Sequence, residues 1–205
     1  MDKSPSKPGL ESGTKRKTPT ITVVVLATTT ALVLLVTTLA STPVPGVPGQ
    51  RFNAGDIMVF ITSLTFGPAV GGFAGGVGSG LSDALLPGGQ YFAPFTLVIK
   101  GTEGYLVGYL AHRSFRRREQ VAWLIGGAVV VGGYFVAESY LIGLVFGVSL
   151  APGLANAITE FPFNVLQAFA AGVVGIPASR YLKNSLPSIL VSSTGTKGAT
   201  SAMKA

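Results

Sequence analysis

The sequence predicts an all-α membrane protein, a polytopic bundle of six transmembrane helices with its N- and C-termini in the cytoplasm. Of its 205 residues, 48% are hydrophobic and 11% are charged, and the mean hydropathy is +0.54. This composition is typical of a polytopic membrane protein. The chain contains no cysteine, which excludes disulfides, thiolate nucleophiles and cysteine-bound metals. A net charge of +7 could suggest a nucleic-acid partner, but the positions of the basic residues indicate membrane topology instead.

The stretch from Phe66 to Gly108 contains two long apolar runs, and glycines recur in it at four-residue intervals, as at Gly67, Gly71 and Gly75. Glycine destabilises the interior of a soluble helix by about 0.8–1 kcal/mol relative to alanine. In a bilayer, by contrast, small residues allow helix backbones to approach closely. We therefore expect this stretch to form closely packed, membrane-embedded helices.

The N-terminal part of the chain predicts a tail followed by a first helix. Residues 1–20 are polar and basic, and we expect a disordered cytoplasmic tail. Residues 21–40 carry no charge, and at ~1.5 Å per residue they span a hydrocarbon core of ~30 Å. A secretory signal has a shorter apolar region of ~7–15 residues, which favours a retained helix. Ala27 and Ala31 share one face of this helix as a small-xxx-small pair, which predicts a docking face.

A proline-rich loop and a helical hairpin are expected next. The segment from Thr42 to Gly49 contains three prolines, which favour an extended, solvated backbone outside the bilayer. The following run from Ala54 to Leu86 is too long for one straight span, and the Gly67-Pro68 pair interrupts it. We therefore expect two helices that break near this pair.

The distribution of basic residues decides the topology. Further helices are predicted over Phe92–Ala111, over Val121–Leu141 and over about residues 155–182. If residues 54–86 cross the membrane twice, thirteen of the fifteen basic residues become cytoplasmic, as the positive-inside rule requires. A single crossing would place the arginine-rich loop outside; that loop carries Arg113, Arg116, Arg117 and Arg118.

We therefore expect residues 21–183 to form one membrane domain and residues 184–205 to form a flexible cytoplasmic tail. The arginine cluster is interpreted mainly as a solvated loop that orients the protein, with a specific lipid or partner site as the alternative.

Ionisable residues inside the apolar runs predict a ligand site. A charge at bilayer depth costs ~2.5–3.5 kcal/mol, so each such residue should face protein or a water-filled cavity. The outer halves of the fourth, fifth and sixth helices hold the candidate substrate-binding residues, which are Lys100, Glu103, Tyr134, Glu138, Glu160, Asn164 and Gln167.

Sequence spacing gives some of these residues a more specific interpretation. Glu160, Asn164 and Gln167 follow i, i+4, i+7 spacing and therefore share one stripe of a helix, and Pro162 in its first turns frees backbone groups. Lys100 and Glu103 are i, i+3 neighbours, which fits either a buried ion pair or ligand contact. Asn164 and Gln167 fit ligand contact or interhelical hydrogen bonds. Tyr134 fits stacking on a flat heterocycle or an interfacial aromatic belt.

Four segments, taken in order, resemble the S components of energy-coupling-factor (ECF) vitamin transporters, nearest to the riboflavin, hydroxymethylpyrimidine and pyridoxine-like group. They are FNAGDIMVFITSLTFGPAVGGFAGGVGSGLSDALL, YFAPFTLVIKGTEGYLVG, GGYFVAESYL and ITEFPFNVLQ. The resemblance implies a plasma-membrane substrate-capture subunit of an importer, with a vitamin pocket at the outer side. It also implies that Ala27 and Ala31 meet a transmembrane coupling subunit, that Thr42–Gly49 is a mobile flap over the pocket, and that two partner ATPases use the ATP.

The chain itself is not expected to be an enzyme or to bind a cofactor. It has no G-x-x-x-x-G-K-[ST] phosphate loop, and its single His112 has no second histidine or cysteine with which to share a metal. No nucleophile or metal cluster indicates a membrane enzyme. A proton-coupled secondary transporter that uses Glu103, Glu138 or Glu160 is the alternative function, although such a transporter should contain two inverted repeats and the halves of this chain do not align.

Overall fold

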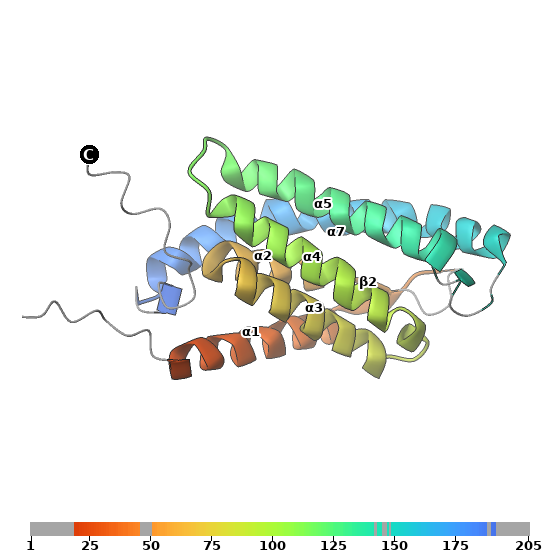
Figure 1. Ribbon diagram of the computed structural model, residues 1–205, viewed down its shortest axis with the longest axis horizontal. Helices are drawn as coiled ribbons and strands as arrows, with labels where there is room; N and C mark the ends of the chain where they lie inside the picture. Colours follow the sequence, from red (N-terminus) through yellow and green to blue (C-terminus); the bar gives the residue numbers. More distant parts are fainter. Residues whose placement is uncertain are drawn as a thin grey trace, which may run out of the picture.

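The described part of the chain forms a bundle of six α-helices that lie along a common direction (Figure 1). The computed structural model describes residues 19–45, 51–141, 143–144, 147, 149–187 and 190–191. The helices of this part of the chain are α1 (Pro19–Leu39), α2 (Gly55–Phe66), α3 (Pro68–Leu85), α4 (Ala93–Ala111), α5 (Arg118–Val136) and α7 (Leu150–Ser185). The predicted six-helix, all-α fold is confirmed.

Short elements connect the helices. Strands β1 (Ser41–Pro43) and β2 (Arg51–Asn53) pair in an antiparallel ladder in which Ser41 lies opposite Asn53. A 3-10 turn, η1 (Gly89–Tyr91), precedes α4, and a π-helical turn, η2 (Ala137–Leu141), continues α5.

Three helical segments within the described ranges are long and apolar enough to cross a membrane: Thr20–Leu39, Arg118–Tyr140 and Leu150–Ser185. The other three helices are shorter or less apolar. Helix α2 has 12 residues, about 18 Å at ~1.5 Å per residue, and α4 contains Lys100 and Glu103. These three helices therefore depend on their neighbours in the bundle for burial of their polar groups.

The predicted break between α2 and α3 lies at Gly67. This residue has a φ of 92°, a conformation that glycine adopts without steric cost, and Pro68 follows at the first position of α3, where its missing N–H is not needed. The side chain of Ser63 packs on Gly71, and that of Val59 packs on Gly75. The two helices thus run in opposite directions, as the hairpin prediction required.

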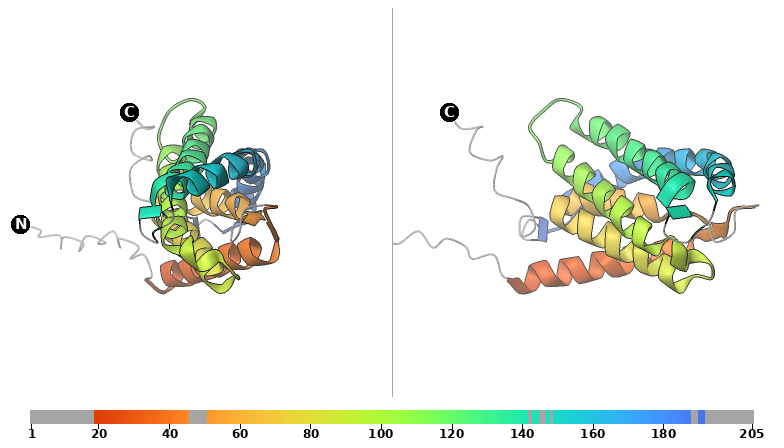
Figure 2. Two further views of the ribbon diagram at one scale, coloured as in Figure 1. Left: turned by 90° about the vertical axis from the view of Figure 1, so that its right-hand side faces the viewer. Right: turned by 45° about the vertical axis from the view of Figure 1, so that its right-hand side comes forward.

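The two ends of the bundle are formed by different elements, as Figures 1 and 2 show. The start of α1, the α2–α3 break, the α4–α5 loop and the last turns of α7 lie at one end, which we call the arginine end because the loop carries Arg113–Arg118. The β1–β2 ladder, η1 and the start of α7 lie at the other, which we call the hairpin end. This relative arrangement agrees with the expected topology, whereas the side of the membrane that each end faces remains a prediction.

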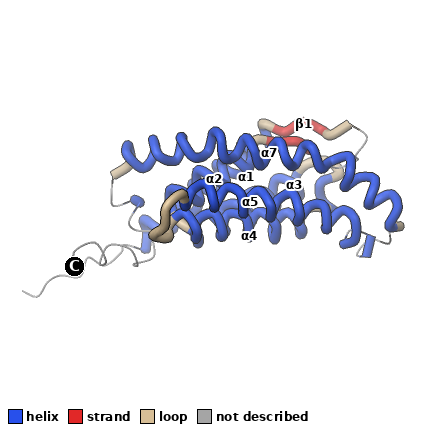
Figure 3. Tube along the Cα trace, turned by 90° about the horizontal axis from the view of Figure 1, so that it is seen from above, coloured by secondary structure: helices blue, strands red, loops and turns tan. Residues whose placement is uncertain are grey.

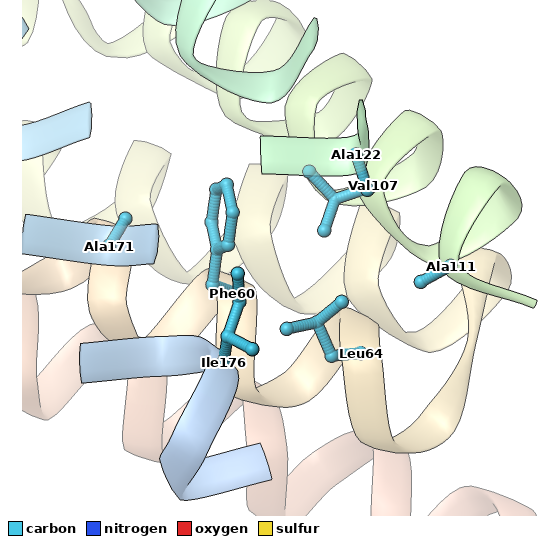
Figure 4. Close-up of a cluster of buried hydrophobic side chains, with 7 residues drawn as sticks. All are labelled: Phe60, Leu64, Val107, Ala111, Ala122, Ala171 and Ile176. Atoms are coloured by element: carbon cyan, nitrogen blue, oxygen red, sulfur yellow. The ribbon is translucent and has the colours of Figure 1, made fainter. Parts of the chain in front are cut away.

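One apolar core cluster of the bundle is drawn in Figure 4. It joins α2, α4, α5 and α7 through Phe60, Leu64, Val107, Ala111, Ala122, Ala171 and Ile176. The same helices also carry buried charged side chains, on Asp56 of α2, Lys100 and Glu103 of α4 and Glu160 of α7.

Glycines bring α3 and α4 into backbone contact. A Cβ atom added to Gly104 would lie 2.3 Å from the carbonyl oxygen of Gly71, and one added to Gly76 would lie 2.7 Å from that of Leu97. Such contacts between helices rely on small residues, so the spacing noted in the sequence has the packing role that we expected.

Replacing Gly104 by leucine should therefore destabilise the protein by about 1–3 kcal/mol or more, the usual cost of overpacking. The matched control is Gly132→Leu in α5, because no described atom outside its own stretch of helix lies within 4 Å of a Cβ added there. Thermal unfolding of both variants in detergent measures the difference. Equal melting temperatures would contradict close α3–α4 packing.

Several predicted boundaries were wrong. Helix α5 begins at Arg118 and not at Val121, because Glu119 in its first turn is favoured by the helix dipole and pairs with Arg180. Helix α7 begins at Leu150 and not near residue 155, since Pro152 in the first turn needs no intrahelical N–H bond.

The structure also corrects three segments that were expected outside the helices. Residues 19 and 20 of the expected N-terminal tail belong to α1, residues 42 and 43 of the expected proline-rich loop belong to strand β1, and residues 184 and 185 of the expected C-terminal tail belong to α7. Residues 46–50, residues 1–18 and residues 192–205 lie outside the described part, so the expected flap and tails stay predictions.

Candidate functional site

All seven predicted substrate-binding residues are buried, each less than 9% exposed. They come from α4, α5, η2 and α7. Polar side chains are costly to bury unless they have partners or a function, so the contacts of each residue decide its role.

The short helix α2 lets an irregular segment enter the bundle. At about 18 Å, α2 is shorter than a ~30 Å hydrocarbon core, and strand β2 leads into its start beside α7 (Figure 3). The backbone N–H of Asn53 donates to Oε1 of Gln167 at 2.7 Å, and Oδ1 of Asn53 accepts the N–H of Gly55 at 2.8 Å. Non-helical backbone at this depth requires such protein partners or a wet cavity.

The two amides of α7 form one hydrogen-bonded unit. Nε2 of Gln167 donates to Oδ1 of Asn164 at 3.2 Å, and Oε1 of Gln167 accepts from the Asn53 backbone. Gln167 therefore ties β2 to α7, while Nδ2 of Asn164 has no hydrogen-bond acceptor among the described residues. Of this pair, Asn164 keeps a donor for a ligand.

Glu138 and Glu160 form a carboxyl pair next to these amides. Glu138 lies in the π-turn η2, Glu160 lies in α7, and their side chains hydrogen-bond to each other. Oε2 of Glu160 has no hydrogen-bond partner in the described part of the chain. Two carboxyl groups in contact cannot both carry a charge without a large penalty, so this pair shares a proton or receives a donor from a ligand. π-turns occur frequently at functional sites.

Helix α7 exposes one further acceptor near this pair. Pro162 lies in the helix interior and not in the first turns, as we had expected. It has no N–H for the carbonyl oxygen of Ile158 four residues earlier, so that oxygen is available to water or a ligand.

Lys100 lies in a buried ion-pair group with two carboxylates. Its Nζ contacts Oδ1 of Asp56 and lies 3.7 Å from Oε2 of Glu103, and the three side chains are at most 3% exposed. The geometry fits the ion-pair interpretation of Lys100 and Glu103, with Asp56 as a third member. Sequence reasoning did not include Asp56 among the candidate residues; the only signal was a carboxylate at the start of a short apolar helix.

Tyr134 joins this group to a second polar chain. Its hydroxyl donates to Oγ1 of Thr96 at 3.0 Å, and Thr96 donates to Oδ2 of Asp83 at 2.5 Å. The ammonium of Lys100 lies 5.4 Å from the ring centroid of Tyr134, a cation–π distance. At 8% exposure, Tyr134 faces protein and does not fit an interfacial belt. Sequence reasoning missed Thr96, a threonine in an apolar helix with no local pattern around it.

Ala27 and Ala31 lie far from this group, on the exposed side of α1. The opposite side of α1 is buried through Val25, Thr29 and Val33. The predicted small-residue face is therefore open to contact with another molecule.

Comparisons with known proteins give consistent results. A family model described as "ECF-type riboflavin transporter, S component" matches residues 17–184. The thiamine precursor transporter HmpT of Lactococcus lactis subsp. cremoris is 30% identical over 149 residues, which cover 73% of this chain and 80% of that protein. A Pyrococcus woesei protein described only as uncharacterized is 38% identical over 159 residues, covering 77% of this chain and 99% of that protein.

A solved structure titled as the S component of a bacterial ECF transporter shares the fold. Its TM-score is 0.63 at 14% sequence identity, and the match covers 82% of this chain and 98% of that chain. Since the family model also covers most of the sequence, the chain belongs to the S components, the membrane-embedded, non-enzymatic substrate-binding subunits of ECF-type transporters.

Proposed function

We propose that this protein captures a pyrimidine-type vitamin precursor at its hairpin end, facing the cell exterior, and delivers it inward across the plasma membrane. S components of ECF transporters work with a membrane coupling subunit and ATPases. We propose that this chain does so with one coupling subunit and two ATPase subunits, which hydrolyse the ATP. The observation that carries the proposal is the buried Glu138–Glu160 pair beside the free Asn164 donor.

The balance of charge favours a neutral or cationic ligand. Five carboxyl groups lie in or beside this group of residues, on Asp56, Asp83, Glu103, Glu138 and Glu160, whereas the described residues contribute only two cations there, the buried Lys100 and the half-buried Arg51. The ammonium of Lys100 already contacts two of these carboxylates. A ligand that brings hydrogen-bond donors would complement the remaining carboxyls, whereas an anionic group would meet an acidic surface.

The side-chain atoms that have no hydrogen-bond partner among the described residues indicate which edge of a ligand would fit. Nδ2 of Asn164 offers a donor and Oε2 of Glu160 an acceptor, so they suit a ligand edge with one acceptor and one donor. A ring nitrogen next to an exocyclic amino group provides this edge, and the amino group has a second hydrogen for Glu138. The name of the relative HmpT, a thiamine precursor transporter, supports this substrate class.

A riboflavin-like ligand is the second candidate, because the matching family model is described by riboflavin. Its ring also offers adjacent acceptors and a donor, but it lacks an amino group for the carboxyl pair. Isothermal titration of the detergent-solubilised protein with 4-amino-5-hydroxymethyl-2-methylpyrimidine and with riboflavin separates the two candidates. Tighter binding of riboflavin would overturn the pyrimidine proposal while leaving the capture role intact.

Uptake assays test the transport mechanism itself. We expect accumulation of the labelled ligand only in cells that also produce a coupling subunit and the ATPases. Uptake that persists without the ATPases and collapses with the proton gradient would instead support the secondary-transporter alternative.

Asn164→Ala should weaken ligand binding by about 1–3 kcal/mol, the usual cost of leaving a buried polar group without its partner, which is roughly a 5- to 150-fold rise in Kd. Asn184→Ala is the matched control, because Asn184 lies on the same helix but is exposed at the arginine end. Titration calorimetry on both variants measures the effect. Unchanged affinity in Asn164→Ala would remove Asn164 from the site.

A further inference from the structure

An open surface cavity of about 330 Å³, five of whose six lining residues are exposed, lies at the arginine end, remote from the substrate site. It is formed by the loop before α5, the first turn of α5 and the last turns of α7. Its lining residues are Phe115, Arg117, Arg118, Glu119, Gln120 and Arg180. The proposed capture of a vitamin precursor uses none of these residues.

The cavity wall carries excess positive charge. Three arginines and one glutamate line it, and the glutamate is engaged, because Glu119 accepts from Nε of Arg180 at 2.8 Å and from its Nη2 at 2.5 Å. Among the described residues, Arg118 donates only to the backbone oxygen of Arg113, at 3.3 Å. The guanidinium of Arg117 has no hydrogen bond or ion pair with any described residue. Arg117 and Arg118 therefore keep free donors for an anion.

Backbone donors add to these side chains. Arg117 precedes α5 with a φ of 61°, the only positive φ of a non-glycine residue in the described ranges, and no side chain caps the helix. The first backbone N–H groups of α5 belong to Arg118, Glu119 and Gln120, and N–H groups at this position have no intrahelical acceptor. All three residues line the cavity.

Exposed apolar side chains lie near the cavity on the helices that form it. Leu124 of α5 is 70% exposed, and Tyr181 of α7 is 76% exposed. In a membrane-embedded bundle such side chains face acyl chains, which places the arginines at the level of the phospholipid headgroups. A phosphodiester could therefore occupy the cavity while its acyl chains follow the adjacent helices.

We propose that this cavity binds the phosphate of an anionic phospholipid headgroup. Arg117 and Arg118 supply charge-assisted hydrogen bonds, the start of α5 supplies backbone donors, and Arg180 is held in place by Glu119. Basic pockets between transmembrane helices suit such headgroups. The apolar flank distinguishes a lipid from free phosphate, because only a lipid gains from contact with Leu124 and Tyr181.

Native mass spectrometry and thermal-shift assays on the full chain with phosphatidylglycerol test this site. We expect a retained phosphatidylglycerol adduct and a raised melting temperature, with no such effect of phosphatidylcholine. The double variant Arg117→Gln/Arg118→Gln should lower the affinity for phosphatidylglycerol about 30-fold, because each arginine near the membrane surface contributes ~1 kcal/mol. Glu119→Gln should strengthen it, because it removes the only carboxylate of the cavity.

The control is Arg113→Gln, because Arg113 lies 4.3 Å over the ring of Tyr109 and does not line the cavity. If this variant loses as much phosphatidylglycerol as the double variant, the attraction is only diffuse surface charge and the site is overturned. Inorganic phosphate or glycerol 3-phosphate that binds as tightly as the lipid would also overturn it, in favour of a soluble phosphate ligand. The affinity for the vitamin precursor should stay unchanged in all three arginine and glutamate variants.

Discussion

Replacing Lys100 by methionine should lower the free energy of unfolding by about 3–5 kcal/mol, the usual cost of breaking a buried ion pair by removing one partner. Lys100 is the only cation in contact with Asp56 and with Glu103 among the described residues. Without it, two carboxylates that are at most 2% exposed would lack a counter-charge. The apparent melting temperature in detergent measures this loss.

Removing all three charges together tests whether the loss of stability comes from the unpaired carboxylates. The triple variant Lys100→Met/Asp56→Asn/Glu103→Gln should recover much of the stability, because no uncompensated charge remains. Lys183→Met is the control for loss of a lysine, since Lys183 lies in the last turn of α7, at the arginine end. A single variant as stable as the parent protein would contradict the ion-pair interpretation.

Ligand affinity in the triple variant decides between the two roles that the sequence left open for Lys100. If the ion-pair group is structural, the triple variant should bind the vitamin precursor as the parent protein does. If it folds but has lost binding, at least one of the three side chains contacts the ligand.

The overall fold could be predicted because membrane constraints act on local sequence. The first helix could be predicted from an uncharged stretch of membrane length. The helical hairpin followed from a Gly-Pro break, and the relative placement of the helix ends followed from an arginine-rich loop. None of these inferences requires knowledge of tertiary contacts. The helix ends were less predictable. Pro152 lies in the first turn of α7 and Pro162 lies in its interior, although proline usually indicates a boundary. The first turn tolerates proline because it needs no intrahelical N–H bond there, and the carbonyl that an interior proline leaves free can bind water or a ligand in a wet cavity.

The members of the candidate site were also predictable, since polar residues are rare in apolar helices and each one must face protein, water or a ligand. Their pairings were not predictable. Asp56 and Lys100 are 44 positions apart, and Asn53 and Gln167 are 114 positions apart, so no helical period connects them. Local spacing did predict that Asn164 and Gln167 share a face, but it could not show that Gln167 is used by β2 while Asn164 keeps a free donor.

The structure separates the two proposed contact surfaces of the protein. The polar groups for the substrate are buried between α4, α5 and α7, whereas the small residues of α1 face outward. A change on α1 should therefore alter partner contact without reaching the ligand.

The double variant Ala27→Trp/Ala31→Trp should abolish transport and leave ligand binding unchanged. Both alanines are exposed, so two indole rings fit without disturbing the fold, but their bulk prevents the close helix approach that small residues allow. Uptake of the labelled precursor, titration calorimetry and co-purification of the coupling subunit measure transport, binding and assembly separately. We expect transport and assembly to be lost and ligand binding to be retained.

Leu124→Trp is the matched control for this variant, because Leu124 is equally open to lipid but lies on α5. It should preserve all three properties, since a tryptophan facing lipid replaces another apolar side chain. Full transport by the α1 variant would mean that the coupling subunit docks elsewhere. Loss of ligand binding with an unchanged melting temperature would mean that α1 contributes to the substrate site, which its outward orientation argues against.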